Sequence, residues 1–487
     1  MTNPTQRPLR RRSVLRAAAA TAALGAASGL SAAGSSSDDE RTKTITGRIE
    51  DDAPDWVYVP FEVPAGVTEL HVEYEYNESE ENVLDIGVFD PDGYDLGNVD
   101  GFRGWSGGAR SEFSISRAAA TPGYVPGPIE SGTWHVILGP YKVSSTGIDY
   151  ELTITMRSVD PGPAFEPDPA PTALNDEAGW YRGDIHLHTV HSDGQYTPSE
   201  VVSRAADADL DFVVPTDHNT PTANLVWGEH ARSDLLVING EEPTTRAGHY
   251  SAIGLEPGQW IDWRYLPEDD QLPRFVEEVR DVGGFTVAQH PFCPYKGCDW
   301  RFGYEHVDTI EVWNGPWTAD DDRSVELWDE LLRDGLAIPA VGGSDSHGPD
   351  RDLGHPQMVV RAPRLAVDAI LPELKAGRSY VAASTDVALR MSVRAGRDRA
   401  EIGETVEAAP DARLVTRLRV VGAASAVATL HTQEGTVKTK PLSEDRETVT
   451  VSTRADEVDY VRAEVRDSEG AMVALTNPVF VRRSTPA

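Results

Sequence analysis

Hydrophobic and polar positions along the chain follow two different periods, and the change of period divides the chain into three parts. Between residues 43 and 158, apolar and polar residues alternate in short runs, such as residues 56–61 and 134–138, separated by Gly, Pro, Asn and Asp. Alternation with period two and frequent turn residues predicts an antiparallel β-sandwich. No constellation of catalytic residue types is visible in this part.

A Pro-rich stretch, residues 159–177, precedes the central part and predicts a linker. Between residues 178 and 395, strand-like apolar runs alternate with amphipathic segments. The first predicted helix has a complete start signal, with Thr197 as N-cap, Pro198 at the first helical position and Glu200 at the third. Repeated strand–helix units predict a parallel sheet, either open or closed into a barrel.

The last part, residues 396–487, returns to short alternating strands, of which residues 413–420 and 458–465 are the clearest. This pattern predicts a small C-terminal β-domain. The domain has no chemical motif of its own, so the sequence assigns it no role.

The N-terminus is typical of a targeting segment. Three arginines, residues 10–12, precede an apolar, Ala-rich run that extends to about Ala33. This arrangement resembles a twin-arginine signal, so we expect a signal peptide at residues 1–33 and a polar linker at residues 34–42. A short membrane anchor is the alternative, which the length and small residues of the run disfavour. We expect twin-arginine export to the cell surface or the extracellular space, and no transmembrane segment in the mature chain.

The charge of the chain excludes some classes of partner. Its 487 residues include 44 Lys and Arg against 79 Asp and Glu, a formal net charge of -35. So acidic a chain is not expected to bind nucleic-acid duplexes or anionic membrane surfaces. Only six of the basic residues are Lys, and this Lys-poor, Asp-rich composition resembles that of salt-adapted proteins. The alternative is an ordinary acidic secreted protein.

The chain has two cysteines, Cys293 and Cys298. They flank one short loop, and in an oxidising exterior we favour a disulfide between them. Free thiols are the alternative, and a metal site is disfavoured because the chain has no second cysteine pair.

Histidines and carboxylates gather just after the predicted strands of the central part. His186 and His188 are two residues apart and so share one face of a strand, and Asp345 and His347 repeat that spacing. The active site of a strand–helix barrel needs ligands at the carboxyl ends of several strands. His and carboxylate together suit Zn, Mn or Fe better than Ca or Mg, so we expect a site for several metal ions. The loop after His188 carries Asp193, and His249 lies on a segment next to a strand end. The other residues at strand ends are Asp217, His218, Glu241, Glu242 and His290.

Five segments in order, residues 186–194, 216–219, 240–249, 289–292 and 343–347, resemble motifs of the PHP (polymerase and histidinol phosphatase) metallohydrolase superfamily. The resemblance covers about residues 178–395. It implies an α/β fold, a distorted (β/α)7 barrel, which holds two or three divalent metal ions. The β-sandwich and the small C-terminal β-domain would flank this barrel. A further segment, Glu-Val-Trp-Asn-Gly at residues 311–315, resembles the CehA/McbA-type branch.

Carried over by position, the resemblance implies nine metal ligands: His186, His188, Asp193, His218, Glu242, His249, His290, Asp345 and His347. Glu242, rather than Glu241, is the expected bridging carboxylate because the family pattern is Gly-x-Glu. Asp193 stands where some relatives have a histidine, which leaves the number of metals open. We expect Asp217 to orient a ligand histidine, or else to cap its strand end, and Glu311 to be structural or substrate-facing.

The expected chemistry follows from the charges of such a site. Divalent cations lower the pKa of a bridging water and neutralise phosphoester oxygens, so we expect phosphoester hydrolysis by a metal-bridging hydroxide. His249 or His347 would also protonate the leaving group. The loop residues Arg246, Lys296 and Arg301 would clamp a phosphate of a small-molecule substrate, or else form surface ion pairs.

Other functions stay open at this point. Hydrolysis of a carbamate, ester or amide is the alternative chemistry, because this branch takes its name from a carbamate hydrolase. A surface-binding protein with a retired site is the alternative class, which the complete ligand set disfavours. Residues 260–263 and 293–300 are rich in aromatic side chains, and they either shape the pocket or pack against the β-sandwich.

Overall fold

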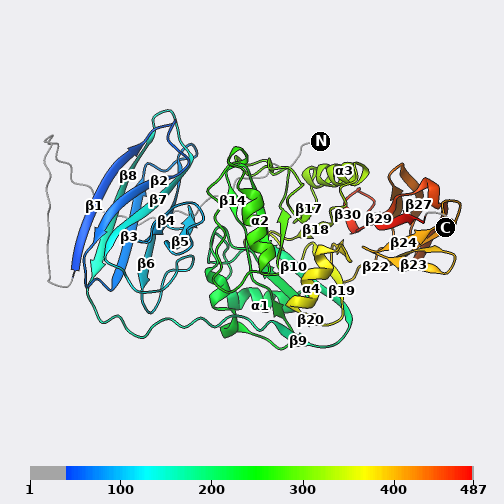
Figure 1. Ribbon diagram of the computed structural model, residues 1–487, viewed down its shortest axis with the longest axis horizontal. Coiled ribbons are helices and arrows are strands. Elements are labelled where there is room, and N and C mark those ends of the chain that lie inside the picture. Colours follow the sequence, from blue (N-terminus) through cyan, green and yellow to red (C-terminus); the bar gives the residue numbers. More distant parts are fainter. Residues whose placement is uncertain (1–39, 485–487) are drawn as a thin grey trace.

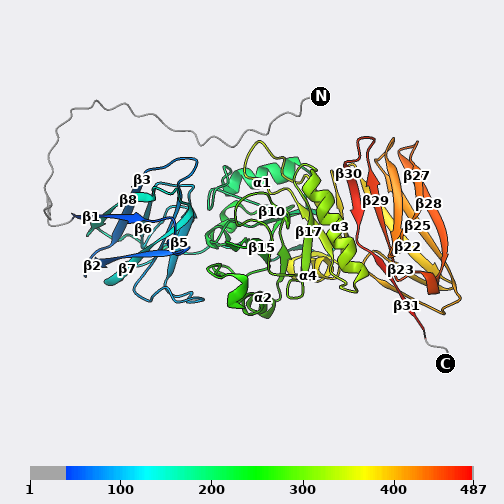
Figure 2. The ribbon, with the colours of Figure 1, turned by 90° about the horizontal axis from the view of Figure 1, so that it is seen from above.

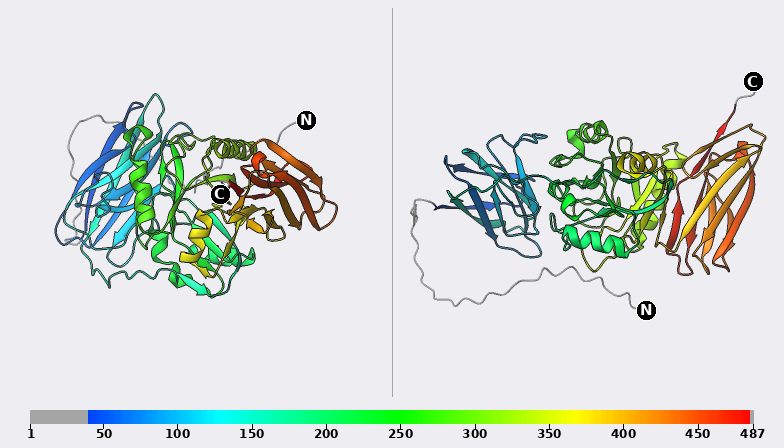
Figure 3. Two further views of the ribbon diagram at one scale, coloured as in Figure 1. Left: turned by 45° about the vertical axis from the view of Figure 1, so that its right-hand side comes forward. Right: turned by 90° about the horizontal axis from the view of Figure 1, so that it is seen from below.

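The computed structural model describes residues 40–484. The predicted signal peptide and residues 34–39 of the predicted linker lie outside the described residues. The central part lies between two β-rich parts, and the three are arranged in a row (Figure 1, Figure 2). Figure 3 shows the same order from two further sides. Within the described residues, no helix is long and apolar enough to cross a membrane.

The N-terminal part is the antiparallel β-sandwich that the alternation predicted. Its two four-stranded sheets have the strand orders β1-β8-β3-β6 and β2-β7-β4-β5. Inward residues such as Trp134 and Ile154 are fully buried between the sheets, as period-two alternation requires. The strands are β1 (Glu40–Ile49), β2 (Val57–Val63), β3 (Glu69–Tyr76), β4 (Val83–Phe89), β5 (Phe102–Gly107), β6 (Glu112–Ser116), β7 (Gly132–Lys142) and β8 (Ile148–Arg157).

The central part contains four α-helices, two larger sheets and one two-stranded sheet. The predicted capping box of the first helix is present: the Thr197 hydroxyl accepts from the Glu200 amide, and the Glu200 carboxylate accepts from the Thr197 amide. The α-helices are α1 (Pro198–Asp207), α2 (Leu272–Asp281), α3 (Ala319–Arg333) and α4 (Val367–Lys375). Short 3-10 helices lie at Thr222–Leu225, Trp227–His230, Pro267–Asp269 and, in the last part, Ala455–Glu457.

One central sheet has the order β12-β11-β10-β19-β21, with β10, β11 and β12 parallel, and the other has the order β13-β15-β16-β17-β18. The first contains β10 (Gly179–Leu187), β11 (Phe212–Pro215), β12 (Leu236–Val237), β19 (Gln357–Ala362) and β21 (Ser379–Ala382). The second contains β13 (Gly240–Glu241), β15 (Gly248–Ile253), β16 (Phe285–Ala288), β17 (Thr309–Asn314) and β18 (Ala340–Gly343), and β14 (Thr244–Thr245) pairs with β15.

The expected seven-unit barrel is not what the described residues form. The two sheets are joined only by isolated parallel bridges, Leu187 to Ser346 and His218 to Glu242, and not by continuous ladders. Strands β15 and β19 run antiparallel to their neighbours, and four α-helices are too few for seven β-α units. Three of the four bridging residues lie beyond the ends of their strands, so the sheets meet at loop residues and not along paired strands.

The C-terminal part shares a sheet with the central part. Strand β21 pairs with β30, so one sheet of 11 strands crosses the expected boundary at residue 395. A second sheet, β23-β22-β25-β28, packs on it around a shared apolar core. The strands are β22 (Ala388–Ala395), β23 (Asp398–Glu401), β24 (Thr405–Ala408), β25 (Arg413–Val421), β26 (Val427–Thr432), β27 (Gly435–Pro441), β28 (Arg446–Arg454), β29 (Tyr460–Arg466), β30 (Met472–Thr476) and β31 (Val479–Arg483).

Two junctions attach the central part to its surroundings. The predicted linker contributes β9 (Ala173–Asn175), which pairs with β20 (Leu365–Ala366). Trp260 stacks on Phe102 of the sandwich at 4.1 Å between ring centroids, and Trp263 lies 4.8 Å from Trp105. The tryptophans of residues 260–263 therefore pack against the β-sandwich.

Candidate metal centre

The strand ends of the central part bring one buried carboxylate into contact with five histidines. Glu242 follows β13 and is fully buried. Its two carboxylate oxygens lie 3.1–3.4 Å from one nitrogen of each histidine. Glu242 and these histidines would be among the residues that hold a divalent metal ion. The histidines are His186 and His188 at the end of β10, His218 after β11, His249 in β15 and His290 after β16.

A second carboxylate, Asp345, follows β18 and extends the cluster. Its Oδ1 lies 3.3 Å from His186 Nε2, 3.1 Å from His188 Nε2 and 3.5 Å from His347 Nδ1. Its Oδ2 accepts a hydrogen bond from Arg351 at 2.8 Å. Asp345 therefore contacts histidines of both sheets, across the bridge between Leu187 and Ser346.

Asp193 lies at the open edge of the cluster. Its Oδ1 is 3.3 Å from His347 Nε2 and 3.7 Å from His218 Nε2. The Asp193 side chain is 48% exposed, whereas that of Glu242 is 0% exposed. All nine residues that the sequence analysis assigned as ligands thus come together, in an order that runs from the buried Glu242 to the exposed Asp193.

Backbone strain accompanies this convergence. His290 has φ 23° and Asp345 has φ 48°, both in the left-handed region that residues other than glycine rarely adopt. Such conformations cost on the order of 1–3 kcal/mol each, and they gather at functional sites. In both cases the strained residue is the second after a strand, where the chain must turn.

The protonation of the cluster is mixed. Burial opposes the charged forms of His186, His218 and His347, but neighbouring carboxylates outweigh it and raise the pKa of all three, that of His347 to about 10. Burial favours the neutral form, but His186 and His218 hold the pKa of the Glu242 carboxyl well below its usual range. Burial, with the neighbouring His347 and His218, lowers the pKa of His188 to about 4. Burial is also the main reason that the pKa of His249 is lowered to about 4. Ionised carboxylates and neutral imidazoles are the forms that bind metal.

Several of the clustered atoms need a further partner. Nε2 of His186, Nδ1 of His249 and Oε2 of Glu242 are buried, and none of their close contacts with described residues has the geometry of a hydrogen bond. A buried polar atom without a partner costs about 1–3 kcal/mol. Cations between these atoms would satisfy them, so the residues present fit a metal site.

The possible ligand atoms form overlapping groups within which all atoms lie within 4.8 Å of one another. Glu242 belongs to one group with His186 and His188, and to another with His218 and His249. These groups of ligand atoms fit the binding of divalent metal ions. His and carboxylate donors suit Zn, Mn or Fe.

Glu311 orients the cluster from behind. Its Oε1 lies 2.9 Å from His186 Nδ1, and its Oε2 accepts from the His290 amide at 3.0 Å and from Asn314 Nδ2 at 3.0 Å. A carboxylate on the far nitrogen of a ligand histidine fixes its ring and tautomer. The structural role of Glu311 agrees with one of the two expectations from the sequence.

Of the two roles expected for Asp217, orienting a ligand histidine is not the one that its contacts support. Its carboxylate accepts from the Thr189 amide at 2.8 Å, from the Thr189 hydroxyl at 2.7 Å and from the Ser192 hydroxyl at 2.7 Å. These bonds hold the turn between His188 and Asp193, and none reaches a ligand histidine. Asp217 therefore shapes the loop and does not touch the candidate site.

The three expected substrate-binding cations also point elsewhere. Arg246 pairs with Asp85 of the sandwich at 3.4 Å, and Lys296 Nζ donates to the Tyr141 carbonyl at 3.0 Å. Arg301 makes a two-bond pair with Asp299 at 2.9 and 2.7 Å. Their alternative role, ion pairing and packing, is the one that the contacts support, because sequence proximity to a ligand does not set side-chain direction.

Arg351 is the cation at the cluster that the sequence analysis missed. Its Nη1 donates to Asp345 Oδ2 at 2.8 Å and to Asn314 Oδ1 at 3.0 Å, and its side chain is 39% exposed. It follows the Asp345–His347 motif by four residues, and this nearness was the only available signal.

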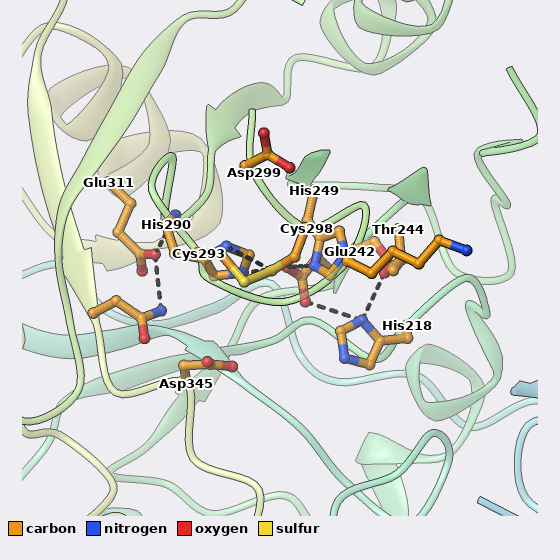
Figure 4. The surroundings of a disulfide bond; sticks show 12 residues. His218, Glu242, Thr244, His249, His290, Cys293, Cys298, Asp299, Glu311 and Asp345 are labelled. Carbon is orange, nitrogen blue, oxygen red and sulfur yellow. Dashed lines mark hydrogen bonds and ion pairs between the residues drawn. A yellow bond between two sulfur atoms is a disulfide. The ribbon is translucent and has the colours of Figure 1, made fainter. Parts of the chain in front are cut away.

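The favoured disulfide is present and lies beside the cluster. Cys293 and Cys298 are bonded, and no cysteine in the described part is free. Cys298 Sγ lies 3.6 Å from His290 Nδ1. Figure 4 shows the loop that it closes, with His249, His290 and His218 around Glu242. The disulfide constrains the loop that follows the ligand candidate His290.

No protein-family description matches the chain, and no curated protein does. Among solved structures, it is similar to a two-domain protein from Bacteroides vulgatus containing a predicted PHP-like metal-dependent phosphoesterase. The identity is 19% and the TM-score 0.36, over 64% of this chain and 98% of that one. An amidohydrolase from Chromobacterium violaceum is 20% identical with a TM-score of 0.29, over 40% of this chain and 96% of that one. TM-scores this low decide neither fold nor activity.

Proposed function

We propose that the protein is a metal-dependent hydrolase of small phosphoesters. The observation that carries the proposal is Glu242, a buried, ionised carboxylate in contact with five histidines. The nine residues from His186 to His347 that converge there would hold two or three ions of Zn, Mn or Fe. When bound, such ions supply Lewis acidity to a substrate oxygen and lower the pKa of water.

The chain's own residues supply orientation and proton transfer. Glu311 holds the ring of His186, and Asp217 holds the turn that carries Asp193. Arg351, at the half-exposed rim, holds the Asp345 carboxylate through a hydrogen bond at 2.8 Å. His347, with a side chain 32% exposed, lies where it would protonate a leaving group whenever it does not hold a metal ion. Burial lowers its pKa, but Asp193 and Asp345 outweigh burial and raise the pKa to about 10, so His347 carries the proton near pH 7. The pKa of His249, lowered to about 4, does not suit that role.

Hydrolysis of nitrophenyl phosphate mono- and diesters, compared with nitrophenyl acetate and an aryl carbamate, tests the substrate class. We expect the phosphoesters to be turned over faster; faster turnover of the acetate or carbamate would replace the phosphoester by the alternative chemistry. His188→Ala and Asp345→Ala should abolish hydrolysis of every substrate. His71→Ala in the sandwich is the matched control and should keep full activity. Full activity in both site variants would refute the site.

Elemental analysis of the purified protein tests the centre without reference to any substrate. We expect two or three equivalents of Zn, Mn or Fe per chain. No bound metal, even after incubation with Mn and Zn, would contradict the proposal. We further propose export by the twin-arginine route and membership of the CehA/McbA-type branch, which rest on residues 10–12 and 311–315. The Arg11→Lys/Arg12→Lys variant tests the route: we expect it to lose export, and continued export would contradict the twin-arginine route.

A further inference from the structure

A charged cleft lies away from the candidate metal centre, between the C-terminal sheet and the central part. It has a volume of about 1180 Å³ and is lined by residues of β22, β23, β25 and β28 on one side and of β10, β19 and α4 on the other. Figure 2 shows β22, β25 and β28 side by side in the C-terminal part. Seven arginines and three glutamates line the cleft, an excess of four positive charges. The chain as a whole has a net charge of -35, so the charge of the cleft is opposite in sign to that of the chain.

Four of the arginines lie on one face of the sheet. Arg417 and Arg419 are two residues apart on β25, and Arg390 on β22 lies directly opposite Arg419. Arg446 on β28 pairs in register with Val421, which is two residues beyond Arg419 and so on the same face. All four are exposed. Neighbouring positions in such a grid are roughly 5–7 Å apart.

These four positive charges are not neutralised by the protein. The guanidinium groups of Arg417, Arg419 and Arg446 form no hydrogen bond or ion pair with any described residue, and that of Arg390 donates only to the Leu389 carbonyl. The other cleft arginines are paired: Arg361 and Arg399 share Glu401, and Arg378 pairs with Glu373. Like charges directly opposite on neighbouring strands destabilise a sheet. An anion in the cleft would remove this repulsion.

One guanidinium is also held in place. Arg390 lies over the Trp180 ring at 3.8 Å from its centroid, a cation–π contact that joins the C-terminal sheet to β10. Stacking orders the long side chain in advance, so less entropy is lost when its donors bind a ligand. The cleft therefore combines free charge with a partly ordered donor set.

We propose that this cleft binds a small ligand that carries several oxyanion groups, phosphates or carboxylates. Arginine pairs with such groups through two parallel hydrogen bonds, which a monatomic anion cannot accept. The separation of the arginines suits a ligand with two or more such groups, and the volume admits an organic molecule. The site shares no residue with the metal centre, so it does not depend on the proposed hydrolase activity.

Calorimetric titration of the purified protein with tripolyphosphate and, separately, with citrate tests this proposal. Both titrations use the same KCl concentration. We expect at least one of the two to bind, and which of them binds tighter distinguishes phosphate from carboxylate recognition. The double variant Arg417→Gln/Arg419→Gln should weaken binding at least about tenfold, because two bidentate partners are lost.

Arg394→Gln/Arg413→Gln is the matched control, because it removes the same charge from the same face of the sheet outside the cleft. It should leave the affinity within about twofold. If the glutamine variant does not fold, Arg417→Lys/Arg419→Lys keeps the charge, loses the two-bond fork and should weaken binding less. Absence of binding by both anions, or equal weakening in cleft and control variants, would overturn the proposal.

Discussion

At the scale of single residues, two consecutive glutamates show how direction decides chemistry. Glu241 and Glu242 are both fully buried. Glu242 faces five histidines, whereas Glu241 Oε2 accepts from the Ile261 amide at 3.0 Å on the other side of the strand. Burial raises the pKa of Glu241 well above its usual range, the opposite of the shift at Glu242. The same residue type, one position apart, is a neutral packing group in one case and an ionised candidate bridge in the other.

We expect Glu242→Gln to lose most of its bound metal, because the neutral amide lacks the negative charge with which the Glu242 carboxylate would attract metal cations. Glu241→Gln is the matched control, and it should keep its metal, because glutamine resembles the neutral acid in size and shape. Metal content by elemental analysis, with thermal unfolding as a check on folding, measures both. Equal metal loss in the two variants would show that backbone disturbance, and not the Glu242 carboxylate, is responsible.

At the scale of elements, one buried network fastens the C-terminal sheet to helix α3. Arg462 in β29 donates to Asp329 of α3 at 2.9 and 2.8 Å, and to Glu464 at 2.6 Å. These three side chains are 3–9% exposed. Burial opposes ionisation of Glu464, but Arg462 outweighs it and the pKa of Glu464 is lowered to about 2.

This network predicts an acid-sensitive junction. A carboxyl with a depressed pKa stabilises the fold above its ordinary pKa of 4.5, and this contribution is lost as the pH falls toward about 2. The shift corresponds to roughly 3 kcal/mol. We expect Glu464→Gln to lower the free energy of unfolding by this order at pH 7, and the difference from the unmodified protein to shrink toward pH 2.

Urea unfolding at a series of pH values measures this difference. Glu469→Gln in the exposed turn before β30 is the matched control, and it should change the free energy of unfolding by less than about 0.5 kcal/mol at every pH. A Glu464→Gln difference that does not depend on pH would contradict the assignment.

The elements also show where sequence patterns suffice. Helix α1 was predictable because Thr197, Pro198 and Glu200 carry its start signal locally. The antiparallel strands β15 and β19 were not, because strand direction depends on which neighbour a strand meets. A run of apolar residues is the same in either direction, so repeated strand–helix units led to the wrong expectation of a seven-unit barrel.

At the scale of the whole molecule, the net charge of -35 predicts dependence on salt. The acidic groups repel one another, and salt shortens the range of this repulsion from ~10 Å at 0.1 M to ~3 Å at 1 M. We expect the unfolding temperature at pH 7 to rise from dilute buffer to molar KCl. The rise should be smaller near the isoelectric point of about 4.7, where the net charge is close to zero. Equal unfolding curves in dilute buffer and in molar KCl at pH 7 would contradict this expectation.

The sequence alone determined the residue types of the candidate site, the β-sandwich and the acidic surface, because each is encoded in local patterns, motif spacing or composition. Nine proposed ligands were named from strand ends and resemblance, and all nine converge. The tertiary structure decided what depends on packing between distant segments. It directed Arg246 and Lys296 to the sandwich and brought Arg351 to Asp345. It also carried one sheet from β10 across the expected domain boundary, and it gathered the arginines of separate strands into one cleft, since only the fold determines which side chains face each other.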